Sequence, residues 1–167
     1  YDYREVGYYF ITICTENRLC LFGEIKNNEM ILNNLGKIVE EEWKKSEMIR
    51  AEIELDAFVI MPNHVHGIVR IKNDGRNVGA NGRSPLHRDD DKFRMKPKSI
   101  SSFISGFKSI AAKRINIFRD TPGSPVWQRN YYEHIIREEN DYNNIRQYIM
   151  LNPLMWDRDK NNVDGFH

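Results

Sequence analysis

The apolar positions of this chain recur with two different periods, and each period predicts one type of element. Short runs of β-branched and aromatic residues, such as YYFITICT at 8–15, predict strands. Such runs lie at residues 8–15, 21–25, 30–32, about 52–61, 64–71 and 126–136. Because only Pro62-Asn63 joins two of these runs, 52–61 and 64–71, we expect them to pair as antiparallel neighbours.

Three other segments repeat their apolar residues every three to four positions, which predicts helices. Asn33 or Asn34 can cap the first helix, which runs to about Ile49. Ser99 caps the second helix, whose apolar stripe continues to Phe118. The third helix spans 138–151 and is stopped by the Asn-Pro pair that follows it.

The order strand, helix, strand, strand, helix, strand predicts a ferredoxin-like sandwich. We therefore expect an α+β fold, an RRM-like antiparallel sheet with two helices on one face and the C-terminal helix over the open face or edge. A chain of 167 residues that is 40% hydrophobic suits one domain. Residues at about 73–98 are rich in Gly, Asn, Arg and Asp, which predicts a mobile loop.

His64 and His66 are the first candidates for chemistry. They lie two positions apart in a predicted strand, so both imidazoles point to the same face of the sheet. Two adjacent imidazoles repel when protonated and need separate partners when neutral, whereas one divalent cation satisfies both. A pair of ordinary half-buried histidines is the alternative.

Tyr148 and Asn152 lie four residues apart on the last predicted helix and therefore share one face. If that face meets the two histidines, a phenol, an amide oxygen and two imidazoles converge. The ligands His64, His66 and Asn152 would leave open positions on a cation. Such a set suits Mg²⁺ or Mn²⁺ completed by substrate oxygens, although imidazoles also admit Zn²⁺ or Ni²⁺.

The net charge of +1 conceals an uneven distribution. Residues 92–119 contain basic side chains and no acidic one, which predicts a surface that contacts a phosphate backbone. The candidate contacts are Lys96, Lys98, Lys108 and Arg114. A solvated helix face is the alternative.

No apolar run approaches a membrane span and no signal-peptide pattern opens the chain, so a cytoplasmic protein is expected.

Four motifs of this chain resemble one family. They are similar to motifs of the REP-associated tyrosine transposases, a branch of the single-tyrosine HUH transposases. The motifs are MPNHVH at 61–66, FKS at 107–109, VWQRNYYEHIIR at 126–137 and YIMLNP at 148–153. His-x-His alone is a weak signal, but its combination with Tyr-Ile-x-x-Asn-Pro is specific. The similarity extends from about Tyr8 to Trp156.

The resemblance implies a metal-dependent endonuclease and strand transferase, a transposase that acts on single-stranded or hairpin DNA. His64 and His66 match the paired histidines that hold the cation, Tyr148 matches the nucleophile, and Asn152 falls at the third ligand. The implied intermediate is a 5′-phosphotyrosine, formed with release of a free 3′-OH. A monomer with its site completed in cis is expected, and a host-adopted protein that nicks without moving itself would share every residue.

Two alternatives remain open at this point. Tyr131 or Tyr132 could be the nucleophile instead, although sheet packing is their other role and the helical register with Asn152 favours Tyr148. His134 is expected to be structural or to contact phosphate. From another class, a non-catalytic RRM-like module would bind nucleic acid through exposed aromatics on central strands. This chain carries histidines there, which favours a metal site.

Overall fold

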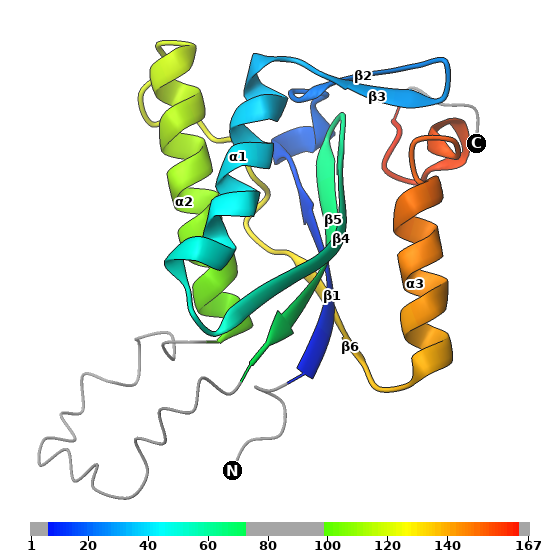
Figure 1. The fold of residues 1–167 in the computed structure, drawn as a ribbon. Helices are drawn as coiled ribbons and strands as arrows, with labels where there is room; N and C mark the ends of the chain where they lie inside the picture. Colours follow the sequence, from blue (N-terminus) through cyan, green and yellow to red (C-terminus); the bar gives the residue numbers. More distant parts are fainter. Residues whose placement is uncertain (1–6, 73–98, 164–167) are drawn as a thin grey trace, which may run out of the picture.

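The structure, a computed structural model, describes residues 7–72 and 99–163 of the 167-residue chain (Figure 1). The mobile loop predicted at about 73–98, and with it Lys96 and Lys98, lies outside the described residues. Within the described ranges, no helix is both long and apolar enough to cross a lipid bilayer.

Four antiparallel strands form the central sheet in the order β4-β5-β1-β6. Two helices, α1 and α2, connect β1 to β4 and β5 to β6 and cover one face of this sheet (Figure 1). This topology confirms the predicted ferredoxin-like α+β fold. The bounds are β1 Gly7–Cys14, α1 Asn34–Ile49, β4 Ile53–Met61, β5 His64–Ile71, α2 Ile100–Phe118 and β6 Tyr132–Ile136.

A separate hairpin follows β1 and pairs β2 (Gly23–Lys26) with β3 (Glu29–Leu32). Its turn uses Asn27 and Asn28, both with positive φ angles of 53° and 63°. Asparagine tolerates this left-handed conformation better than most residues, so the Asn-Asn pair suits the turn.

The main core lies between the sheet and the two helices. Ile11 and Ile13 of β1 point into it, and the indole of Trp43 on α1 packs edge-on against Phe103 and Phe107 of α2. Both helices begin at the predicted caps, Asn33 and Ser99, whose side chains accept backbone N–H bonds. Because strand residues alternate between faces, the odd-numbered residues of β1 serve this core and the even-numbered ones face the other side.

Gly67 of β5 lies where the Trp43 indole contacts the sheet. A Cβ atom at position 67 would come 2.5 Å from Cζ2 of Trp43, and the fully buried indole has no room to withdraw. We expect Gly67→Ala to lower the free energy of unfolding by about 1–3 kcal/mol through overpacking. Urea denaturation measures this change, and a midpoint equal to that of the parent protein would contradict it.

The third helix, α3 (Glu139–Leu151), lies on the face of the sheet opposite α1 and α2 (Figure 1). Only Ile149 of this helix is buried, against Ile68 of β5 and Ile136 of β6. The second core is therefore small, and most of α3 faces outward.

Strand β6 is shorter than the strand predicted at 126–136. Trp127 forms an isolated bridge with Thr15, and the regular ladder begins only at Tyr132. In between, the carbonyl groups of Gln128 and Asn130 accept hydrogen bonds from the ammonium group of Lys108, at 2.8 and 3.2 Å. Carbonyl groups turned toward a helix cannot extend the sheet, and local sequence did not reveal this contact.

Candidate metal centre

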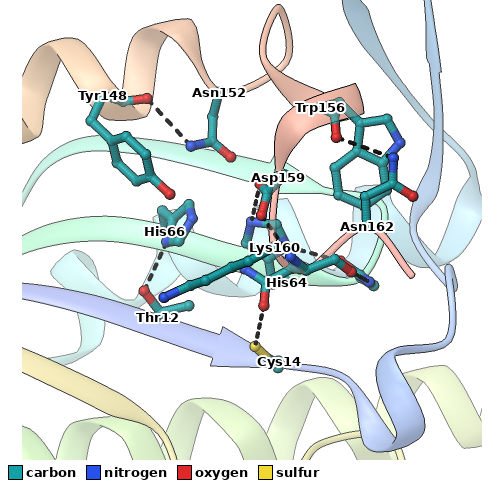
Figure 2. Close-up of polar contacts among 12 residues, drawn as sticks. Thr12, Cys14, His64, His66, Tyr148, Asn152, Trp156, Asp159, Lys160 and Asn162 are labelled. Carbon is teal, nitrogen blue, oxygen red and sulfur yellow. Dashed lines mark hydrogen bonds and ion pairs between the residues drawn. The ribbon is translucent and has the colours of Figure 1, made fainter. Parts of the chain in front are cut away.

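His64 and His66 lie side by side on β5, beneath α3, with ring centroids 4.4 Å apart (Figure 2). Their side chains are buried, with 0% and 2% exposure. His64 Nδ1 is 2.8 Å from Oδ1 of Asn63, and His66 Nδ1 is 2.8 Å from Oγ1 of Thr12. An amide oxygen only accepts, so the proton of His64 resides on Nδ1 and Nε2 keeps its lone pair.

One buried atom of each of the three predicted ligands has no hydrogen-bond partner among the described residues. They are Nε2 of His64, Nε2 of His66 and Oδ1 of Asn152. Buried polar atoms are nearly always paired, so three unpaired polar atoms in one place need a common explanation. A bound cation provides one, and two imidazoles with an amide oxygen are ligands that Mn²⁺, Mg²⁺ or Zn²⁺ accepts.

Asp159 is a fourth candidate ligand, and the sequence analysis did not identify it. Its Oδ2 atom is 3.7 Å from Nε2 of His64, and the ligand atoms of these two residues and His66 lie within 4.8 Å of one another. The chain reaches this position after α3 and the short 3-10 turn η4 (Trp156–Arg158). No sequence spacing relates Asp159 to the histidines, because the approach depends on where the chain runs after α3.

Burial lowers the pKa of His64 to about 4, although the negative charge of Asp159 opposes the shift. Burial also lowers the pKa of His66 well below its ordinary value, and the adjacent His64 adds to that effect. Both imidazoles are therefore neutral at pH 7, with lone pairs available for a cation.

The free energy of unfolding of the metal-free protein is expected to fall as the pH is lowered from about 6.5 to about 4. In this window the unfolded chain binds a proton at His64 and the folded chain does not, so acid favours unfolding. The loss for His64 approaches roughly 3 kcal/mol at the acid end, and His66 acts in the same direction. Urea denaturation in a chelator at several pH values measures it, and His64→Gln should reduce the pH dependence. A free energy that is constant across this window would contradict the expectation.

Tyr148 of α3 leans over His66, with ring centroids 5.4 Å apart, and its side chain is 45% exposed (Figure 2). Partial burial raises the pKa of the phenol and the charge of Asp159 raises it further, while an interaction with the Asn152 amide opposes them. The phenol is therefore protonated at neutral pH unless a positive charge is close. The structure brings Tyr148, Asn152 and both histidines to one place (Figure 2), which the sequence offered only as a condition, and their roles stay predictions.

A polar cluster fixes α3 to the edge strand β4. The Tyr142 hydroxyl donates to one carboxylate oxygen of Asp56, and the Arg146 guanidinium donates to the other at 2.9 Å. Asp56 lies where the β4–β5 register shifts, between Leu55 and Phe58. Because α3 buries so little apolar surface, we expect these contacts to help hold it over the histidines.

Asp56→Ala is expected to loosen α3, since it removes the acceptor of both Tyr142 and Arg146. Amide hydrogen exchange in α3 should then accelerate by about tenfold or more, whereas α2 keeps the protection of the parent protein as an internal control. Equal acceleration in both helices would show a global loss of stability instead. Unchanged exchange in α3 would show that the cluster does not anchor the helix.

The two DNA-binding candidates within the described residues do not lie at the candidate metal centre. Lys108 and Arg114 belong to α2, on the opposite face of the sheet from α3 (Figure 1). Lys108 is engaged by backbone carbonyls, and partial burial lowers its pKa. Arg114 forms ion pairs with Glu41 and Glu42 at 2.9 and 2.8 Å. Their contact with DNA stays a prediction.

Tyr131, just before β6, and Tyr132, its first residue, point to opposite faces of the sheet. The Tyr131 hydroxyl is 3.1 Å from Oγ of Ser101, on the side of α2. Tyr132 lies on the α3 side, where its ring meets Phe10 edge-on. His134 forms a 2.7 Å ion pair with Asp141 when protonated, away from the candidate metal ligands.

Known proteins resemble this chain in sequence and in fold. No protein-family model matches the chain. An uncharacterized protein of Haemophilus influenzae is 42% identical, over 98% of this chain and 89% of its own length. A second protein of Haemophilus influenzae, with the provisional name REP-associated tyrosine transposase, is 24% identical over 92% of this chain and 73% of its own length.

A solved structure shares the fold. It is that of a REP-associated tyrosine transposase bound to a REP hairpin, which is 20% identical with a TM-score of 0.60 and covers 90% of this chain and 68% of that one. The four-stranded antiparallel sheet and its three helices are common to both. The chain is thus similar in sequence to a protein that is named a REP-associated tyrosine transposase, and it has the fold of a solved structure of that family.

Proposed function

We propose that this chain is a metal-dependent, single-stranded DNA endonuclease and strand transferase that acts through a 5′-phosphotyrosine intermediate. The observation that carries this proposal is the group of unpaired buried atoms on His64, His66 and Asn152 beneath the phenol of Tyr148. A purely structural histidine pair would leave these atoms unsatisfied at a considerable cost in free energy. A site for a cation and a phosphate explains why the fold retains them.

In this proposal Nε2 of His64, Nε2 of His66 and Oδ1 of Asn152 hold a divalent cation, with the Asp159 carboxylate adjacent. The cation, Mg²⁺ or Mn²⁺, supplies a Lewis acid that polarises a phosphate oxygen and favours the phenolate of Tyr148. Asn63 and Thr12 orient the imidazoles by bonding the Nδ1 atom of each ring. Asn63 and Thr12 therefore fix the orientation of both rings in the absence of DNA.

Tyr148 provides the nucleophile. Its Oη atom attacks phosphorus, the Oη–P bond forms, and the bond from phosphorus to the 3′ oxygen breaks. The phenolic proton is lost to solvent and the departing 3′ oxygen gains one, so a free 3′-OH results. No water enters the phosphodiester linkage, and a 3′-OH can reverse the step. The activity is thus strand transfer as well as cleavage.

The proposed substrate is single-stranded DNA beside a hairpin. The similar solved structure contains a REP hairpin, and α3 leaves the edge strand β6 and the Tyr148 ring accessible on the same side of the sheet. We also propose that one chain completes its own site, because α3 packs on the sheet that carries His66 and is fixed there by Asp56.

Incubation with hairpin oligonucleotides and Mn²⁺ or Mg²⁺ tests the proposal. A 5′-phosphotyrosine retains the DNA downstream of the cleaved bond, so a label at the 3′ end should migrate with the protein on a denaturing gel. A label at the 5′ end should appear on a shorter free strand. Peptide mass analysis should place the adduct on Tyr148. Hairpin binding without any adduct, across metals and sequences, would favour the non-catalytic binding module instead.

A further inference from the structure

Tyr132 is the most exposed large side chain on the α3 face of the central sheet. It lies on β6 with 57% of its surface accessible among the described residues, although it sits within a regular strand. Thr12 of β1 pairs with His66 on one side and with Tyr132 on the other. The three side chains therefore form one row across neighbouring strands and point to the same face.

The row connects Tyr132 directly to the candidate metal centre. Two strand spacings amount to about 10 Å between the backbones at His66 and Tyr132. The ring of Phe10 fills the interval, stacked on His66 with centroids 5.4 Å apart and edge-on to Tyr132 and Tyr148 at 6.2 Å each. The aromatic surface is therefore continuous from the proposed nucleophile to the outer strand.

The surroundings of Tyr132 suit a nucleic-acid strand. Strand β6 is an edge strand, since the sheet order ends there, so nothing in the sheet blocks approach from outside. Exposed Arg129 precedes Tyr132 by three residues and exposed Arg137 follows the strand, and both offer positive charge to a phosphate backbone; the acidic Glu133 next to Tyr132 is also exposed. An exposed aromatic ring suits contact with a single strand, because every base presents a π face.

We propose that Tyr132 stacks on a nucleobase next to the phosphate that occupies the metal centre, so that single-stranded DNA crosses the sheet from His66 toward β6. This inference rests on the proposed function, because it takes the scissile phosphate to lie at the histidines. Stacking fixes the flanking nucleotide without reading its hydrogen-bonding edge. The contact would therefore contribute affinity and position and little sequence preference.

Equilibrium binding of fluorescent hairpin oligonucleotides tests this proposal in a Tyr148→Phe background, where no covalent step can contribute. Tyr132→Ala is expected to weaken binding by about 10- to 100-fold, the range of one lost base–aromatic stack. Tyr132→Phe and Tyr132→Trp keep the ring and should bind within about threefold of the Tyr148→Phe parent. Phe118→Ala, an equally exposed aromatic at the end of α2, is the matched control and should have no effect.

Abasic sites placed one at a time along the single strand identify the stacked nucleotide. At one position next to the cleaved bond, removal of the base should weaken the parent and leave the Tyr132→Ala variant almost unaffected. Losses at the other positions should be equal in both proteins, whereas a variant that has lost its fold would respond at no position. Equal losses for both proteins at every position would overturn the proposal.

The outcomes separate the two proposals. An adduct at Tyr148 with no effect of Tyr132→Ala on binding would reject the stacking platform and leave the nuclease in place. A position-specific effect of Tyr132→Ala with no adduct under any metal would reject the nuclease. It would also reject the placement of the stacked base beside a scissile phosphate.

Discussion

Tyr148→Phe is expected to abolish both the covalent adduct and strand cleavage while changing hairpin affinity by less than about threefold. The substitution removes one oxygen atom, and in our proposal that oxygen is the only atom that bonds to phosphorus. The ring stays in contact with His66 and Phe10, so the fold and the DNA surface should be retained. Gel analysis of adduct and product, with binding measured in parallel, gives both quantities.

Two matched variants make this result specific. Tyr131→Phe and Tyr132→Phe each remove the hydroxyl group of one alternative nucleophile, and both variants should still form the adduct. Cleavage at the parental rate by Tyr148→Phe would reject the mechanism. Adduct formation that is lost only in Tyr131→Phe or only in Tyr132→Phe would identify that tyrosine as the nucleophile.

His64→Ala and His66→Ala are each expected to weaken binding of Mn²⁺ by more than about 100-fold and to prevent adduct formation. Each substitution removes one of the unpaired buried nitrogen atoms that we assign to the cation. Calorimetric titration with Mn²⁺ measures the affinity without DNA. Mn²⁺ should also raise the unfolding temperature of the parent protein and not that of the variants.

His134→Ala is the matched control, because this histidine lies on the same face of the sheet and pairs with Asp141 instead. Its affinity for Mn²⁺ should equal that of the parent. Asn152→Ala and Asp159→Ala then compare the two oxygen ligands. The larger loss of affinity identifies the residue that completes the site, and parental affinity in both histidine variants would show that no metal binds there.

A mixture of the Tyr148→Phe and His64→Ala chains tests whether one chain supplies every residue of its own site. Each chain lacks a different part of the site, and α3 is fixed to its own sheet through Asp56. We therefore expect the mixture to remain inactive. Restored cleavage would show that α3 is exchanged between two chains.

The sequence by itself determined the elements and the direction of their side chains. Alternation placed His64 and His66 on one face, and helical spacing placed Tyr148 above Asn152 on another, because both patterns follow from local backbone geometry. The order of helices and strands along the chain and the cap at Ser99 also followed from the sequence, which narrowed the other cap to Asn33 or Asn34. Such features depend on residues within a few positions of one another.

Only the tertiary structure decided that the histidine face of β5 meets the Tyr148 face of α3. It also decided which further residues lie at this site. Asp159 reaches His64 because the chain turns back over the sheet after α3. Lys108, whose contact with phosphate stays a prediction, donates hydrogen bonds to carbonyl groups before β6, where the strand has not yet begun. Tyr132 comes into line with His66 through the register of β1 with both of its neighbours. Each of these contacts joins residues that are far apart in the chain. Such contacts form only when the whole fold packs, so local sequence spacing does not predict them.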